Sequence, residues 1–173
     1  MTNVLVAPRN FLHDTTDWKA GALAGALAGV FFLMLEMTLV WAAQGQSFWA
    51  PPYRLAATLM GSDVLPSAGA LAVFDLKVLA IALLVHFPVA ILFGLCGAWL
   101  MHRFDWMGGL LMGAGLGLSM YLINVHLMAT WVFPWFEMAR NWVGVVSHLA
   151  FGVVMGLCYI AFRKPHIPFT YLD

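Results

Sequence analysis

Hydrophobic positions in this chain run together in four long stretches and do not alternate with polar positions. The stretches cover residues 18–43, 73–101, 107–133 and 142–162. Crossing the roughly 30 Å hydrocarbon core of a bilayer takes a helix of about 20 apolar residues, and each stretch is long enough. Within lipid the backbone groups of a single stretch pair with one another only if the stretch is helical. The pattern therefore predicts an all-α integral membrane protein, a bundle of four transmembrane helices.

The same pattern of residues occurs twice along the chain. The first and third stretches match at a constant offset along the chain. Asp17, Trp18, Gly21, Gly25 and Gly29 correspond in order to Asp105, Trp106, Gly109, Gly113 and Gly117. The second and fourth stretches match at another offset: His86, Gly94, Leu95 and Cys96 correspond to His148, Gly156, Leu157 and Cys158. Both copies start on the same side of the membrane. We therefore expect two parallel-repeat helical hairpins, related by a pseudo-twofold axis along the membrane normal.

This repeat sets the layout of a single membrane domain, residues 1–173. Its parts are an N-terminal cytoplasmic arm (1–17), a first hairpin (18–101) with a long outer loop at 44–72, a second hairpin (105–162) and a C-terminal tail (163–173). Glycine at every fourth position lets two helices approach closely, and lipid supplies no hydrophobic drive to bring helices together. The glycine rows therefore predict the helix-packing faces.

The two outer connections carry their own signals. Pro51-Pro52 followed by residues 53–60 predicts a short helix lying in the membrane interface, because proline is favoured in a first helical turn. In the second connection, Glu137 and Arg140 have the spacing of a pair on one helical turn.

Composition agrees with the membrane assignment. The chain is 63% hydrophobic and 9% charged, whereas an ordinary soluble domain is about 45–50% apolar and about one quarter charged. Its net charge of zero gives no basis for nucleic-acid binding. Five basic residues fall on one side and three on the other: Arg9, Lys19, Arg103, Arg163 and Lys164 against Arg54, Lys77 and Arg140. The positive-inside rule then places both termini in the cytoplasm.

Four polar side chains lie at membrane depth, where such residues are costly and default to functional candidates. Glu36 and its repeat partner Asn124 lie on the helix faces that carry the glycine rows. His86 and His148 are the other matched pair. At about 1.5 Å per residue, all four lie about 22–27 Å from their inner helix ends. We expect them to form one layer in the outer third of the bilayer.

This layer supports several chemistries, and the residues leave them all open. His86 and His148 are candidate axial ligands of a b-type haem. Glu36, His86 and His148 are candidate ligands of a transition metal, with Asn124 hydrogen-bonded around them. Glu36 beside two imidazoles also suits a proton or ion pathway. The remaining interpretation is a hydrogen-bonded cluster that fixes helix register and binds nothing.

Several short tracts resemble a known group of proteins. Glu36-Met37 and residues 49–52, 133–136 and 140–142 are similar to small four-helix bacterial inner-membrane proteins, some of which are labelled sodium:proline symporters. The resemblance implies a multi-pass protein of the bacterial inner (cytoplasmic) membrane and names no reaction. Secondary transporters usually have more spans, with broken helices around a midplane site, whereas the four stretches here are continuous.

Our leading functional prediction is a non-catalytic polytopic membrane subunit or accessory protein of a larger, respiratory or otherwise energy-converting, membrane complex. Four spans with short inner connections leave no soluble catalytic domain. The expected partners are the lipid bilayer and other membrane subunits or further copies of the chain. The alternatives are a haem- or metal-binding redox protein using His86 and His148, and a proton or ion pathway using Glu36.

Overall fold

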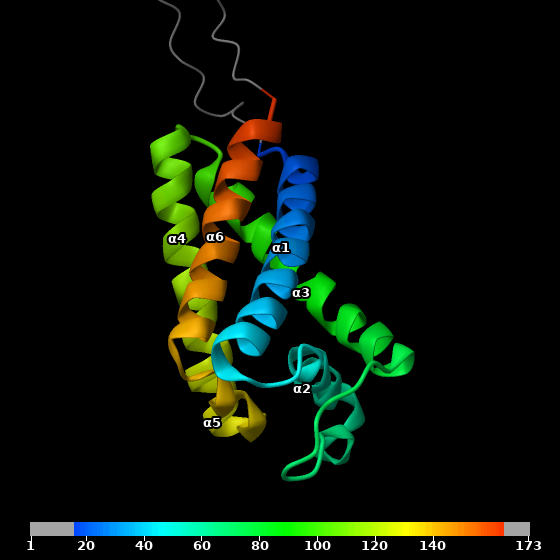
Figure 1. Ribbon diagram of the computed structural model, residues 1–173. Coiled ribbons are helices and arrows are strands. Elements are labelled where there is room, and N and C mark those ends of the chain that lie inside the picture. The colour runs from blue at the N-terminus through cyan, green and yellow to red at the C-terminus, as the bar shows by residue number, and fades with distance from the viewer. Residues whose placement is uncertain (1–15, 165–173) are drawn as a thin grey trace, which may run out of the picture.

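Four long apolar helices make up most of the protein. The computed structural model describes residues 16–164, and within them every regular element is a helix. The long helices are α1 (Trp18–Gln44), α3 (Leu76–Met101), a third helix over Trp106–Trp131, and α6 (Trp142–Phe162) (Figure 1). Each is long and apolar enough to cross a membrane. The predicted all-helical class and the four apolar helices are confirmed; most of the N-terminal arm and most of the C-terminal tail lie outside the described residues.

The third helix runs without a break but changes its winding. It starts as α4 (Trp106–Tyr121), continues as the π-helix η3 (Leu122–Met128) and ends in the short α5 (Ala129–Trp131). A π-helical segment inside an α-helix is rare and is found disproportionately at functional sites. The sequence prediction of a uniform helix missed this change, which falls on Asn124.

The short helix predicted in the first outer loop is present, and its place in the membrane interface stays a prediction. It is α2 (Ala50–Met60), and it begins a few residues before the predicted start because Pro51 and Pro52 occupy its first turn. A 3₁₀ turn, η2 (Ser62–Val64), follows it, and the second connection holds the 3₁₀-helix η4 (Pro134–Ala139).

The helices pack in the order α3, α1, α6, α4. α1 lies between α3 and α6, and α4 packs on α6. Both described chain ends lie at one end of the bundle, which we call the termini end; α2 and α5 lie at the other, the loop end (Figure 1). α3 slants away from the bundle toward the loop end, and α2 packs against it there.

Small residues set the close contacts within each pair of helices. A Cβ on Gly113 would collide with the backbone carbonyl of Gly152, and one on Gly29 would come 3.2 Å from Nε2 of His86. Contacts of this kind join Gly21 to Gly94, Gly25 to Ala90 and Gly29 to His86 between α1 and α3, and Gly109 to Gly156, Gly113 to Gly152 and Gly117 to His148 between α4 and α6. The predicted glycine rows are therefore the packing faces.

The helix starts are capped by side chains. The carboxylate of Asp17 accepts a hydrogen bond from the backbone N–H of Ala20 (3.0 Å), and Asp105 accepts one from Gly108 (2.8 Å). The bond from Ala20 is the main cause that lowers the pKa of Asp17 below its ordinary value. Such caps satisfy N–H groups that have no partner within the helix.

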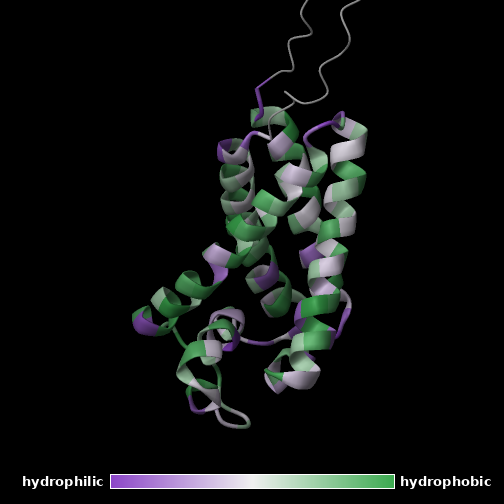
Figure 2. Ribbon diagram, turned by 180° about the vertical axis from the view of Figure 1, so that it is seen from behind, coloured by the Kyte–Doolittle hydropathy of each residue, from purple (hydrophilic) through white to green (hydrophobic). Residues whose placement is uncertain are grey.

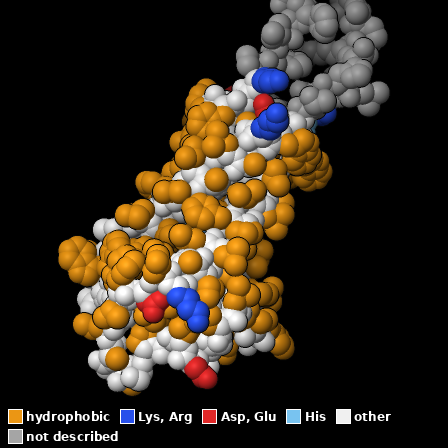
Figure 3. Space-filling model, turned by 90° about the vertical axis from the view of Figure 1, so that its right-hand side faces the viewer, with side chains coloured by type: hydrophobic (Ala, Val, Ile, Leu, Met, Phe, Trp, Pro, Cys, Tyr) orange, Lys and Arg blue, Asp and Glu red, His pale blue; other side chains and the backbone are white. Residues whose placement is uncertain are grey.

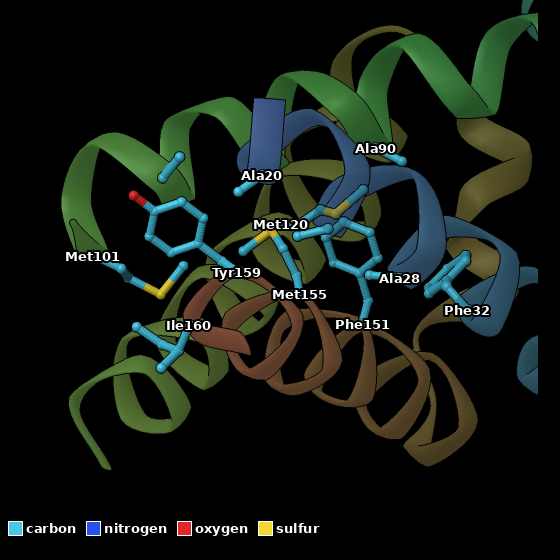
Figure 4. Close-up of a cluster of buried hydrophobic side chains, with 12 residues drawn as sticks. Ala20, Ala28, Phe32, Ala90, Met101, Met120, Phe151, Met155, Tyr159 and Ile160 are labelled. Carbon is cyan, nitrogen blue, oxygen red and sulfur yellow. The ribbon is translucent and has the colours of Figure 1, made fainter. Parts of the chain in front are cut away.

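An apolar core fills the bundle on its termini side. Phe151, Met155 and Tyr159 of α6 are almost fully buried, and Met101 of α3 and Met120 of the third helix pack around them (Figure 4). Ala20, Ala24 and Ala28 of α1 complete this core. Their small size lets α1 lie close to both of its neighbours.

At the termini end, Arg163 ties α6 to the connection between α3 and α4. Its guanidinium donates to the backbone carbonyls of Met101 (3.1 Å), His102 (2.6 Å) and Phe104. These carbonyls lie at and beyond the end of α3, where no intrahelical donor is available.

The outer surface is apolar over the length of the helices. Large apolar side chains are exposed on all four, Phe31, Leu84, Leu111 and Leu149 among them. Apolar residues (green) predominate along the helices in Figure 2, and on the face drawn in Figure 3 charged side chains gather toward the two ends of the molecule. This distribution is consistent with a membrane protein.

Candidate functional site

The loop end of the bundle contains a cavity of about 530 Å³. All four polar residues singled out from the sequence line it, each from a different helix: Glu36 from α1, His86 from α3, Asn124 from η3 and His148 from α6. The expectation that these side chains gather in one place is met. The structure adds Arg54 and Thr58 of α2, which close the cavity toward the loops.

Apolar side chains form the rest of the cavity wall. They come from all the surrounding elements and include Phe32, Leu55, Val89, Met120, Met128, Phe133 and Phe136. Two leucines in the lining, Leu59 of α2 and Leu84 of α3, are 64% and 65% exposed and mark its edge at the outer surface. The cavity is therefore a mostly apolar pocket with a few polar groups, as ligand sites in proteins commonly are.

Each histidine is held by a backbone carbonyl. Nε2 of His86 is 2.9 Å from the carbonyl oxygen of Gly29 and donates to it. Nδ1 of His148 donates to the carbonyl of Gly144 (2.8 Å), while its Nε2 lies 3.5 Å from the side-chain nitrogen of Asn124. Because the amide N–H donates, Nε2 of His148 accepts, so the arrangement suits a neutral ring with its proton on Nδ1.

A phenyl ring separates the two imidazoles. Phe32 stacks on His86 with centroids 5.6 Å apart and meets His148 edge-on at 4.8 Å. A haem held by both histidines would need the space between them that the Phe32 ring fills. Among the described residues, no three of the His, Cys, Asp and Glu side chains are grouped to hold a metal ion. The haem and metal hypotheses gain no support here and stay predictions.

Glu36 and Arg54 are the two charged groups of the cavity. The Glu36 side chain is half-buried, and within residues 16–164 its carboxylate has no hydrogen-bond partner. Arg54 is only 6% exposed and donates to the side-chain oxygen of Gln46. Burial lowers the pKa of Arg54, and the Glu36 carboxylate acts in the opposite direction. The two charges therefore act on each other across the cavity without direct contact.

Sequence reasoning missed Arg54 as a site residue and counted it only as an outer basic charge. A signal was present: Pro51, Arg54, Leu55, Thr58 and Leu59 have the spacing of one helix face, and all five line the cavity. A charged residue in the middle of an otherwise apolar helix face points to a partner of opposite charge beneath that face.

The second outer connection holds the π-helix in place. Arg140 donates from Nε to the carbonyl of Val125 (3.0 Å) and from Nη2 to the hydroxyl of Thr130 (2.7 Å). Its Nη1 lies 3.2 Å from the Glu137 carboxylate, so the predicted pair is confirmed. His126, on the far side of the π-helix, is exposed and does not line the cavity.

Replacing Arg140 with glutamine is expected to lower the free energy of unfolding by about 1–3 kcal/mol, because the Val125 carbonyl loses its side-chain donor. Hydrogen exchange should also quicken at residues 122–130, where the π-helix loses its support. Glu137→Gln removes only an exposed ion pair and should cost less than about 1 kcal/mol. Denaturant titration in micelles measures both; equal losses would mean that Arg140 acts through Glu137 alone.

Comparison of the chain with protein-family models, with curated proteins and with solved structures finds no match.

Proposed function

We propose that this chain is a multi-pass protein of the bacterial inner membrane, with both termini in the cytoplasm, that serves as a non-catalytic subunit or accessory protein of a larger membrane complex. A respiratory or other energy-converting complex is the host we favour. The observation that carries the proposal is the outward face of the bundle, where four helices long enough to cross a membrane expose large apolar side chains. Lipid or another membrane protein would cover such a face.

The uneven burial of the four helices supports a subunit role. In the most apolar window of α1 and of α6, 44% of the residues are buried, against 28% for α3 and for the third helix. α3 and the third helix therefore leave much of their surface for outside contacts. Subunit contacts in membranes use packing between such helix faces.

The close contacts support an origin by duplication of one hairpin. Gly25 meets Ala90 in the first pair of helices, and their repeat counterparts Gly113 and Gly152 meet in the second. In both copies an aspartate caps the first helix: Asp17 and Asp105 each accept a hydrogen bond from the backbone N–H three residues later. The extra length of the first copy lies in the connection that holds α2.

A topology and assembly experiment tests this proposal. With Cys96 and Cys158 replaced by alanine, single cysteines placed at residue 68 and at residue 173 should react with a membrane-impermeant reagent from opposite sides of the inner membrane. The chain extracted in digitonin should migrate in native gels as an assembly well above the size of a 19.0 kDa chain in the same micelle. Labelling of both cysteines from one side contradicts the topology, and single-step photobleaching of isolated monomers in native membranes contradicts the subunit role.

Of the two alternatives, the ion pathway has one observation in its favour: the carboxylate of Glu36 lies in the cavity and has no hydrogen-bond partner within the part of the chain that the structure describes. The apolar core around Phe151 and Met155 lies between that cavity and the termini end. A pathway would therefore need a route outside this bundle, along a partner. Unchanged proton flux in liposomes carrying Glu36→Gln would remove this alternative.

A further inference from the structure

We propose that the cavity at the loop end binds one uncharged amphiphile drawn from the bilayer, whose head group both donates and accepts hydrogen bonds. The inference uses the membrane placement proposed above but does not depend on any partner complex. It assigns a ligand class to a cavity whose charges, walls and edge are all set by described residues.

The charges of the cavity define the head group. Glu36 contributes a carboxyl group and Arg54 a guanidinium. An anionic or a cationic head would meet one attractive and one repulsive group here and would gain little net Coulomb energy from the pair. An ionised carboxylate only accepts hydrogen bonds, and a guanidinium only donates them. Glu36 has no hydrogen-bond donor among the described side chains, and the Arg54 side chain bonds only to Gln46 there. A head group that lies between them must therefore offer both a donor and an acceptor.

The walls define the rest of the ligand. Phe32 and Met120 lie at the termini side of the cavity, and Phe133 and Phe136 come from the second connection. A volume of about 530 Å³ holds a small polar head with several methylene groups or one ring. Apolar side chains of this kind favour a hydrocarbon body by about 0.8 kcal/mol for each buried methylene.

The position of the edge indicates the route of entry. Leu84 of α3 and Leu59 of α2 are exposed at the cavity, and the lining on the other side comes from η3 of the third helix. α3 and the third helix diverge toward the loop end, as the view from behind shows (Figure 2). An opening flanked by exposed leucines between two spanning helices faces lipid. A ligand that enters there must first dissolve in the bilayer.

Acylglycerols and hydroquinones with an alkyl tail are two natural classes with this chemistry. The probes are therefore radiolabelled 1-monododecanoylglycerol and decylhydroquinone kept reduced by dithionite, each with the full chain in nanodiscs. Dodecanoate and dodecyltrimethylammonium are the charged comparators of equal tail length. We expect saturable binding of one molecule per chain for at least one uncharged probe, and the probe that binds tighter identifies the source. The proposal is overturned if either charged comparator binds more tightly than the uncharged probes, or if neither uncharged probe binds saturably.

Three variants separate a built site from simple partition into lipid. Glu36→Gln and Arg54→Gln should each weaken binding of the uncharged probe about tenfold, because each removes one side of the head-group contact. Leu55→Trp should abolish binding by filling the cavity while leaving both charges in place. Glu137→Gln, an exposed carboxylate outside the cavity, is the matched control and should stay within twofold. Equal affinity of the uncharged probe for all four variants would mean simple partition into lipid and would overturn the proposed site. This outcome does not depend on the result of the topology experiment.

Discussion

Alanine at Gly113 is expected to lower the free energy of unfolding by about 2 kcal/mol, whereas alanine at Gly115, two residues further along the same helix, leaves it unchanged or raises it. A Cβ on Gly113 meets the backbone carbonyl of Gly152, and a backbone cannot rotate aside as a long side chain can. Overpacking of this kind costs about 1–3 kcal/mol. A Cβ on Gly115 has no heavy atom within 4 Å, so only the higher helix propensity of alanine, up to about 1 kcal/mol, remains.

Reversible unfolding in mixed micelles, titrated with a denaturing detergent, measures both changes. The duplicated hairpin adds a sharper expectation: Gly25→Ala, whose Cβ meets the carbonyl of Ala90, should match Gly113→Ala to within about 0.5 kcal/mol. Equal losses for Gly113 and Gly115 would show that helix flexibility, rather than close packing, explains the glycine rows. A large loss at Gly113 with none at Gly25 would keep the packing but count against equivalent hairpins.

Sequence reasoning placed the helices well because the signals are long. A run of about 20 apolar residues leaves little choice of structure in lipid, and the observed α6 (Trp142–Phe162) has the predicted bounds. Side chains at helical spacing also allowed the grouping of Glu36 with His86 and His148, since axial rise and facing direction follow from position alone. Those quantities fix where a side chain starts but not where its terminal atoms lie.

The features that were missed depend on contacts between distant segments. The π-helix is held by Arg140, whose guanidinium reaches the Val125 carbonyl from the next connection, and no local pattern around Asn124 reports this. Phe32 lies between His86 and His148 because of the side-chain conformations of three helices at once. The haem hypothesis rested on two matched histidines on facing helices. Both line one cavity, and the Phe32 ring lies between them.

The charges of Glu36 and Arg54 are expected to be energetically coupled by about 1–3 kcal/mol, although no direct ion pair joins them. Each single change to glutamine leaves an opposite charge without compensation in a buried setting, and such a charge is expensive. The double variant Glu36→Gln with Arg54→Gln removes both charges, so it should lose less stability than the two single losses added together. Coupled residues that share a cavity typically show interaction energies of about 0.5–3 kcal/mol.

The exposed pair Glu137 and Arg140 gives the control cycle within the same protein. Their atoms are in contact at 3.2 Å, yet both side chains reach solvent, so their coupling should stay below about 1 kcal/mol. If distance alone set the coupling energy, the exposed pair would be coupled more strongly, because Glu36 and Arg54 are further apart. A larger coupling for the cavity pair therefore means that burial under α2 strengthens the interaction across it. Additive losses for Glu36 and Arg54 would instead mean that water or lipid head groups screen the cavity, and the charge balance that selects an uncharged ligand would no longer hold.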